Sequence, residues 1–191
     1  MMLKDNGERT EFETGAVRSI QSDNGRCDLL PLKQICKLFE GGGSKIDSLV
    51  VSVLSALNDY IYNGGTDKIY KAISEITSVC YDDTPTMILD LSIHFKECLK
   101  KYPERNWERG LPTHSFIDSG VRHLMKIARG DKDEPHVRAL IWNLLAVVWN
   151  DENKPECVDL PFVNLLCVPN KYRPDISEAI ACSCQVGKYQ G

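Results

Sequence analysis

Residues 136–150 constrain the fold of this chain more than any other segment, because they are apolar on almost every side of a helical wheel. The preceding run Asp131-Lys132-Asp133-Glu134-Pro135 predicts where this helix begins, since carboxylates favour the positive end of a helix dipole and proline suits a first turn. A helix with so little polar surface must be covered by other elements. We therefore expect it at the centre of the fold.

Helical periodicity accounts for most of the remaining chain, whereas alternating strand patterns are weak. Apolar residues spaced by threes and fours predict helices over about 29–39, 46–61, 69–79, 87–102 and 115–129. The second and third of these form a helical hairpin. The fourth carries a polar stripe of the kind that is usually solvated, made of Asp90, His94, Glu97 and Lys101. The predicted fold class is all-α, a helical bundle.

The length fits one domain with an arm at one end and an extension at the other. A chain of 191 residues buries enough surface to need neither disulfides nor a structural metal. We expect a single helical domain over residues 1–163, in which a polar arm ends near Arg26. Residues 164–191 are expected to form an irregular C-terminal extension.

Charge and hydropathy exclude several classes of protein. There are 23 Lys and Arg residues against 27 Asp and Glu, a net charge of -4 with no basic block, so duplex nucleic acid is not an expected partner. No apolar run approaches the roughly 18 to 20 residues of a membrane span, and the polar N-terminus is unlike a signal peptide. We expect a cytoplasmic protein with no membrane partner.

The eight cysteines lie at irregular spacings without a CxxC pair, which favours reduced thiols. Those nearest the C-terminus are Cys157, Cys167, Cys182 and Cys184. A zinc site made of these four is a minor alternative, because the spacing Cys182-x-Cys184 is tighter than that of most zinc sites.

Polar side chains interrupt the apolar segment 136–150 along one stripe, at His136, Asn143 and Asn150. They fit a structural role, since buried polar groups are generally hydrogen-bonded to neighbouring helices. They also fit a functional role, because the short connection 130–135 makes the two flanking helices antiparallel. That arrangement brings further polar side chains close, namely Asp118, Arg122, His123 and Asp131. Carboxylates and imidazoles that converge in this way can hold a divalent cation.

The loop 102–110 combines an aromatic ring, an amide and two guanidinium groups, at Trp107, Asn106, Arg105 and Arg109. Arginine binds phosphate in a bidentate manner and tryptophan stacks on a base, although a loop tryptophan more often packs on a core. Several other chemistries lack their motifs: there is no GxxxxGK[ST], GxGxxG, GxSxG or HExxH, and no histidine is followed by aspartate.

A set of motifs resembles one known family, the phage and prophage proteins described as dATP/dGTP diphosphohydrolase, N-terminal domain. The matching segments are Thr14–Arg18, Gly25–Pro31, Lys101–Pro112, Asp118–Leu124, Gly130–His136, Trp142–Asn143 and Asp159–Phe162. The resemblance covers about residues 9–163. Within it, the hairpin over about residues 40–86 looks like an insertion.

The resemblance implies an all-helical nucleotide pyrophosphohydrolase, similar to the MazG-like class, that cleaves a purine deoxynucleoside triphosphate between its α and β phosphates. It implies Mg²⁺ or Mn²⁺ as cofactor, held by Asp118, Asp133 and Glu134. His123 or His136 would accept a proton, and Asp133 would be essential for turnover. The expected substrate-binding residues are Arg18, Arg26, Arg105, Asn106, Trp107, Arg122 and Asn143.

Two alternatives remain open. The paired Glu-x-x-Glu and Glu-x-x-Asp motifs of MazG-like enzymes are not matched, since Glu8 and Glu11 in the polar arm form the one Glu-x-x-Glu of the sequence. A nucleotide-binding protein without turnover, such as a sponge that sequesters a nucleotide signal of host defence, would use the same arginines and tryptophan. A helical scaffold without nucleotide affinity is the other alternative. The resemblance also implies a homo-oligomer, located in the host cytosol if a phage encodes it.

Overall fold

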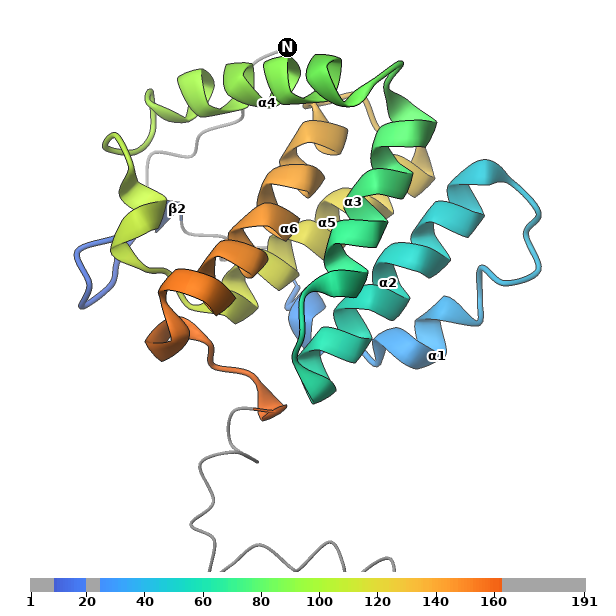
Figure 1. Ribbon diagram of the computed structural model, residues 1–191, viewed down its shortest axis with the longest axis horizontal. Coiled ribbons are helices and arrows are strands. Elements are labelled where there is room, and N and C mark those ends of the chain that lie inside the picture. Colours follow the sequence, from blue (N-terminus) through green and yellow to red (C-terminus); the bar gives the residue numbers. More distant parts are fainter. Residues whose placement is uncertain (1–8, 20–24, 163–191) are drawn as a thin grey trace, which may run out of the picture.

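The computed structural model describes residues 9–19 and 25–162, and within them the chain is mainly helical (Figure 1). The α-helices are α1 (Leu32–Cys36), α2 (Lys45–Asn63), α3 (Asp67–Cys80), α4 (Thr84–Cys98), α5 (Thr113–Arg129) and α6 (His136–Asn153). Short 3-10 turns lie at η1 (Cys27–Leu29), η2 (Asn106–Arg109) and η3 (Pro155–Cys157). The predicted all-α class is confirmed, while the predicted extension 164–191 lies outside the described residues.

The predicted central helix is α6. It packs along α5 and is also contacted by α3 and α4, and in Figure 1 α4 crosses one end of it. Leu140, Ile141 and Val147 on α6 are completely buried. Their burial explains the apolar wheel, because each side of this helix faces another element rather than water.

The helices α2 and α3 form the predicted hairpin, which packs on both central helices. Ser44 and Asp47 make a reciprocal capping box that fixes the start of α2. From α2, the Tyr60 hydroxyl donates a hydrogen bond to Asp151 Oδ1 at 2.8 Å, near the end of α6. These contacts tie the hairpin to the core, and its status as an insertion stays a prediction.

The polar stripe of α4 faces the protein interior, so the expectation of a solvated face was wrong. His94 is 4% exposed, whereas the apolar Leu99 that follows α4 is 55% exposed. The cause lies on α6, where the buried Arg138 pairs with Asp90 at 3.2 Å and with Glu97 at 2.7 Å. A buried guanidinium is costly without anionic partners, and α4 turns its carboxylates inward to supply them.

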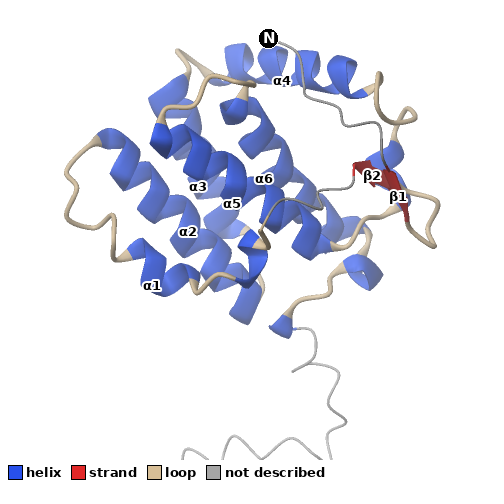
Figure 2. Cartoon of the chain, turned by 180° about the vertical axis from the view of Figure 1, so that it is seen from behind, coloured by secondary structure: helices blue, strands red, loops and turns tan. Residues whose placement is uncertain are grey.

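Part of the N-terminal arm forms a small hairpin that the sequence did not indicate. Strands β1 (Arg9–Glu11) and β2 (Val17–Ser19) pair antiparallel, with Thr10 opposite Arg18. Figure 2 shows them beside the chain that follows α4, on the opposite side from α1. At three residues each, these strands are too short for an alternating pattern to be recognised. Among the described residues, the helices are too short or too polar to cross a membrane.

Candidate functional site

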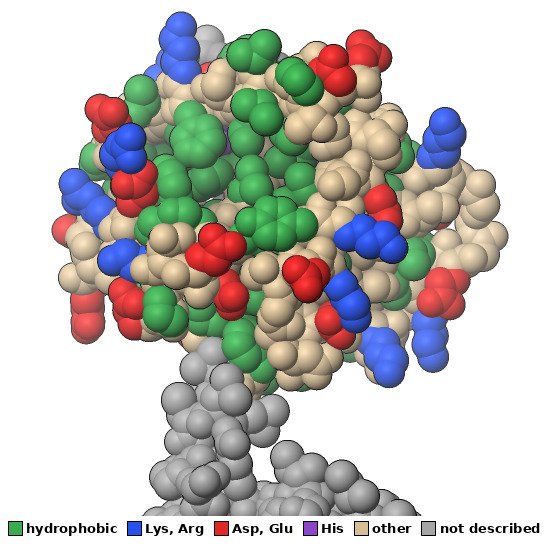
Figure 3. Space-filling model, viewed as in Figure 1, with side chains coloured by type: hydrophobic (Ala, Val, Ile, Leu, Met, Phe, Trp, Pro, Cys, Tyr) green, Lys and Arg blue, Asp and Glu red, His purple; other side chains and the backbone are tan. Residues whose placement is uncertain are grey.

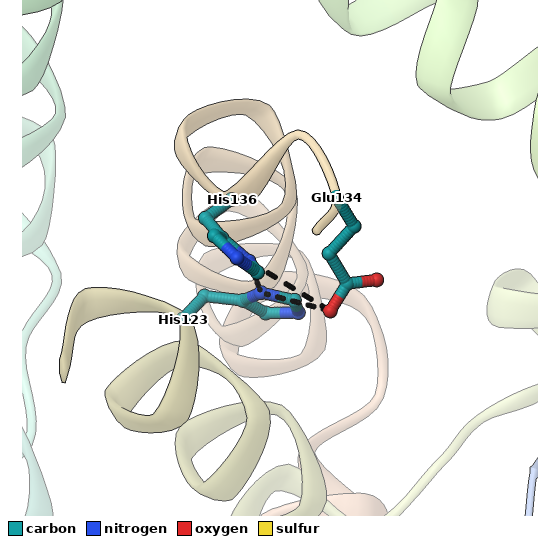
Figure 4. A group of neighbouring side chains, drawn as sticks. All are labelled: His123, Glu134 and His136. Carbon is teal, nitrogen blue, oxygen red and sulfur yellow. Dashed lines mark hydrogen bonds and ion pairs between the residues drawn. The ribbon is translucent and has the colours of Figure 1, made fainter. Parts of the chain in front are cut away.

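Two imidazoles and a carboxylate meet where α5 passes into α6 (Figure 4). His123 projects from α5, His136 opens α6, and Glu134 lies in the connecting loop. His123 Nδ1 lies 3.1 Å from His136 Nδ1, and Glu134 Oε1 lies 3.9 Å and 3.7 Å from these two atoms. Their ligand atoms all lie within 4.8 Å of one another, a spacing that suits one metal ion.

A second group shares His136 and adds two carboxylates, Asp131 and Asp133. His136 Nε2 lies 2.7 Å from Asp133 Oδ1, a hydrogen bond that orients the ring. Lys126 Nζ contacts Asp133 Oδ2 at 3.3 Å and Glu134 Oε1 at 3.2 Å, so it links the two groups. An ammonium therefore balances the acidic charge of the cluster in this structure.

The local electrostatics keep His123 neutral and Asp131 ionised. Burial lowers the pKa of His123 well below its usual range, and the neighbouring His136 lowers this pKa further. A hydrogen bond from Arg129 lowers the pKa of Asp131. Neutral imidazoles and ionised carboxylates are the forms that bind metal.

A cavity of about 490 Å³ adjoins this cluster, with His123, Lys126 and Glu134 in its wall. This volume suits a small-molecule ligand. Residues of β2, α4, η2, α5 and α6 line the cavity. Its aromatic lining consists of Phe95, Tyr102, Trp107, Phe116 and Trp142, and its cationic lining of Arg18, Lys101, Arg105, Arg122 and Lys126. On the face shown in Figure 3, hydrophobic side chains gather below α4 and over α6.

Two of the predicted phosphate-binding arginines are held firmly at the cavity. Arg18 donates hydrogen bonds to Ser115 O at 2.7 Å and Ser119 Oγ at 2.5 Å, and its guanidinium lies over the Phe116 ring. Burial lowers the pKa of Arg18, although a guanidinium stays protonated in proteins. Arg122 donates to Asp118 Oδ2 at 2.5 Å.

The structure separates Arg26 and Asp118 from the cluster. Arg26 is exposed, pairs with Asp28 at 2.6 Å, and does not line the cavity. Asp118 accepts hydrogen bonds from Cys27 N at 2.6 Å and from Arg122, and belongs to neither candidate metal group. The geometry thus favours Asp118 as the residue that orients Arg122, rather than as a metal ligand.

The predicted base-binding loop lines the cavity but is already engaged in packing. Asn106 is buried, accepts from Val17 N at 2.8 Å and donates to Val17 O at 2.9 Å, so its amide pins β2. Trp107 packs edge-on against Trp142 and Trp149. Arg105 is exposed and pairs with Glu108 at 2.6 Å. Of the three, Trp107 and Arg105 can still present a surface to a ligand.

The three residues of the polar stripe on α6 differ in whether their contacts fit a structural or a functional role. Asn150 is wholly structural, because its amide donates to Leu111 O at 2.8 Å and Thr113 Oγ1 at 2.9 Å. Asn143 donates to Ala139 O at 2.8 Å and also lines the cavity. His136 belongs to the cluster. Position on the stripe alone could not distinguish these roles.

Lys126 and His94 are among the cavity residues that sequence reasoning did not identify as site residues. Lys126 lies one helical turn after His123 on α5, and that spacing was the available signal. His94 lines the cavity, yet its Nδ1 is buried without a hydrogen-bond partner in the described part of the chain. The available signal was Arg138, a charged residue within the largely apolar segment 136–150. A buried guanidinium needs carboxylates from a neighbouring helix, and those of α4 lie on the same stripe as His94.

Comparison with known proteins supports one family. Residues 67–159 match the family described as dATP/dGTP diphosphohydrolase, N-terminal. The match runs from the first residue of α3 to Asp159 and so includes the cluster on α5 and α6, but not β2. No curated protein and no solved structure matches the chain.

Proposed function

Because residues 67–159 match the family described as dATP/dGTP diphosphohydrolase, N-terminal, we propose that this chain hydrolyses purine deoxynucleoside triphosphates to monophosphates and pyrophosphate. The observation that best supports this proposal is the cavity, whose wall combines residues of the His–carboxylate cluster with cationic and aromatic side chains. Such a cavity offers a place for phosphates, for a base and for a divalent cation together. The host cytosol, a phage origin and a homo-oligomer are parts of the same proposal.

In this proposal Arg18, Arg122 and Lys126 bind phosphate oxygens, and the aromatic walls hold the base. Arg18 and Arg122 are already fixed by hydrogen bonds, so they lose little freedom when a phosphate binds. Asp118 is a positioning residue for Arg122. Asn106 acts indirectly, because it holds the strand that carries Arg18.

The cluster fits a divalent cation at His123, Glu134 and His136. A cation held by these residues would offset phosphate charge and lower the pKa of the attacking water. Two imidazole nitrogens suit Mn²⁺ better than Mg²⁺, which prefers oxygen ligands. Asp133 orients His136 through a hydrogen bond at Nε2. In the proposed reaction the oxygen of the attacking water joins the α-phosphorus as the bond to pyrophosphate breaks, and the proton of the water is released to solvent.

The experiment is to incubate the protein with dATP or dGTP and Mn²⁺ or Mg²⁺ and to identify the products by mass spectrometry. We expect monophosphate and pyrophosphate in equal amounts. Glu134→Gln should lower this turnover at least 100-fold, because it removes the carboxylate of the proposed metal site. Glu75→Gln on α3, away from the cavity lining, is the matched control and should leave turnover unchanged. Full activity of a folded Glu134→Gln protein would refute the assignment.

A nucleotide-binding protein without turnover is the second candidate, and the position of Lys126 favours it. Its ammonium already contacts two carboxylates of the cluster, at 3.2 Å and 3.3 Å, where a cation would otherwise be needed. In that case the same incubation would deplete the nucleotide from solution. Heating the protein would then release it intact.

A further inference from the structure

The outward side of α4 is apolar, and the described residues leave it uncovered. Ile88, Leu89 and Ile93 are 55%, 68% and 48% exposed. On a helical wheel these three residues lie on the side opposite the buried Leu91. In Figure 1, α4 crosses one end of α6, and its other side faces away from the remaining helices. Ile88, Leu89 and Ile93 thus form an apolar stripe on α4 that lacks a partner in the described chain.

The ion pairs of Arg138 explain why this stripe faces outward. From α6, the buried Arg138 holds Asp90 and Glu97 on the inward side of α4. The opposite side of the helix then cannot reach the core, although its residues are apolar. Single exposed apolar side chains are common, but several together along one helix usually mark a contact with another molecule. The fold therefore presents the apolar stripe of α4 as a surface for a partner.

Charges at the two ends of α4 indicate which partner fits this surface. Asp82 and Asp83 are exposed at the start of the helix, whereas Lys96 and Lys100 are exposed near its end. In Figure 3 the hydrophobic side chains over α4, at the top of the molecule, lie between acidic side chains at one end and a basic side chain at the other. Asp82 lies seven residues before Leu89, and Lys96 lies seven residues after it. A surface with this pattern is complementary to itself when one copy is turned end to end.

We propose that α4 packs antiparallel against α4 of a second copy of this chain, about a two-fold axis at Leu89. The inference deepens the homo-oligomer of the proposed function and rests on that part of it. Antiparallel packing places Asp82 of each copy beside Lys96 of the other, whereas parallel packing would bring like charges together. The apolar stripes of the two copies then cover each other, and the same surface serves both partners.

This packing also covers one edge of the cavity. Leu99, just after α4, is exposed and lines the cavity. Because the two helices run in opposite directions, the start of α4 in the second copy lies beside the end of α4 in the first. The second copy therefore covers the cavity edge at Leu99.

Sedimentation velocity of the whole chain over about 1 to 100 µM tests this interface. Wild type should sediment as a dimer at the higher concentrations. Leu89→Arg should weaken the dimer about 100-fold, because it brings two guanidinium groups together at the two-fold axis. Leu38→Arg is the matched control and should leave the dimer unchanged, since Leu38 is 79% exposed but follows α1, far from α4 (Figure 1). Circular dichroism establishes that each variant is folded.

Charge reversal tests the antiparallel direction. Asp82→Lys and Lys96→Glu should each weaken the dimer about tenfold, because each places like charges side by side. The double variant should recover the affinity of wild type, since opposite charges again face each other. Weakening in both single variants without recovery in the double variant would refute antiparallel packing.

A chain that stays monomeric at about 100 µM would refute the interface, as would a folded Leu89→Arg protein that dimerises as tightly as wild type. These results are separate from turnover. Dimers that hydrolyse neither dATP nor dGTP would overturn the proposed activity alone, and hydrolysis by a monomer would overturn the interface alone.

Discussion

His123 and His136 show how close packing sets the chemistry of single residues. Their Nδ1 atoms lie 3.1 Å apart, too close for both rings to carry positive charge at low cost. The Glu134 carboxylate lies near both rings, and the Asp133 carboxylate is hydrogen-bonded to Nε2 of His136. Two imidazoles beside carboxylates form a donor set for a borderline divalent metal ion rather than for Mg²⁺.

The buried neutral His94 should make the protein less stable in acid. Its pKa is about 4 in the folded chain and about 6.5 when unfolded, so the unfolded state binds more protons between these values. The stabilisation is complete above pH 6.5 and is lost as the pH falls toward 4. We expect His94 to account for about 2 kcal/mol of the loss in unfolding free energy between pH 7 and pH 4.5.

Urea unfolding of wild type and His94→Leu at both pH values checks this. The variant should lose less unfolding free energy than wild type over the same pH interval. Both proteins lose some, because the carboxylates that they share become protonated in acid. Parallel losses in the two proteins would contradict the prediction.

Some features of the candidate site could be predicted from the sequence, and others could not. The stripe at His136 and the antiparallel neighbour with His123 were predictable from helical spacing. The role of Asp118 was not, because its carboxylate is used by Cys27 N and Arg122, and only the packed structure brings Cys27 beside α5. For the same reason, the helical wheel placed His94 on a solvated face.

Among the elements, α4 depends most on a single ion-pair network. Arg138 on α6 holds Asp90 and Glu97, which lie two turns apart on α4. Helical periodicity predicted that α4 exists, but it could not predict its rotation. The orientation of α4 about its own axis depends on the charge of Arg138 on α6. The sequence pattern of α4 alone carries no information about that charge.

Arg138→Met should loosen α4 and destabilise the protein by about 2 kcal/mol. The value lies below that of a fully buried pair, because the Asp90 side chain is 36% exposed. Adding Glu97→Gln should recover part of the loss, since it removes a carboxylate left without its partner. Lys68→Met, which breaks the exposed pair with Asp59, should change stability by less than about 0.5 kcal/mol. Equal effects of Arg138→Met and Lys68→Met in chemical denaturation would show that the network does not hold α4.

At the scale of the whole molecule, the cavity exists only because distant segments converge. Val17 and Arg18 from the arm, His94 from α4 and Asn143 from α6 all line it. The sequence predicted the arm, the helices and the central position of α6. It could not predict that the Asn106 amide would bind the Val17 backbone and close the cavity wall, because that contact joins residues 89 positions apart.

Metal binding to the cluster should stabilise the whole fold, because ligands bound only by the folded state add to its stability. If 1 mM Mn²⁺ is about 100 times its Kd, it adds about 2.7 kcal/mol and raises Tm by about 5 °C. Mg²⁺ should raise Tm less, since imidazole nitrogens are poor ligands for it.

Variants then locate the metal site in the fold. His136→Gln should abolish the Mn²⁺-dependent rise in Tm, because His136 belongs to both candidate groups. Asp118→Asn should preserve this rise even if it lowers the starting Tm, since Asp118 belongs to neither group and serves Arg122. Thermal scans with and without Mn²⁺ measure both effects. Loss of the rise in Asp118→Asn, with its retention in His136→Gln, would place the metal at the α5 carboxylate beside Cys27 and away from the junction of α5 and α6.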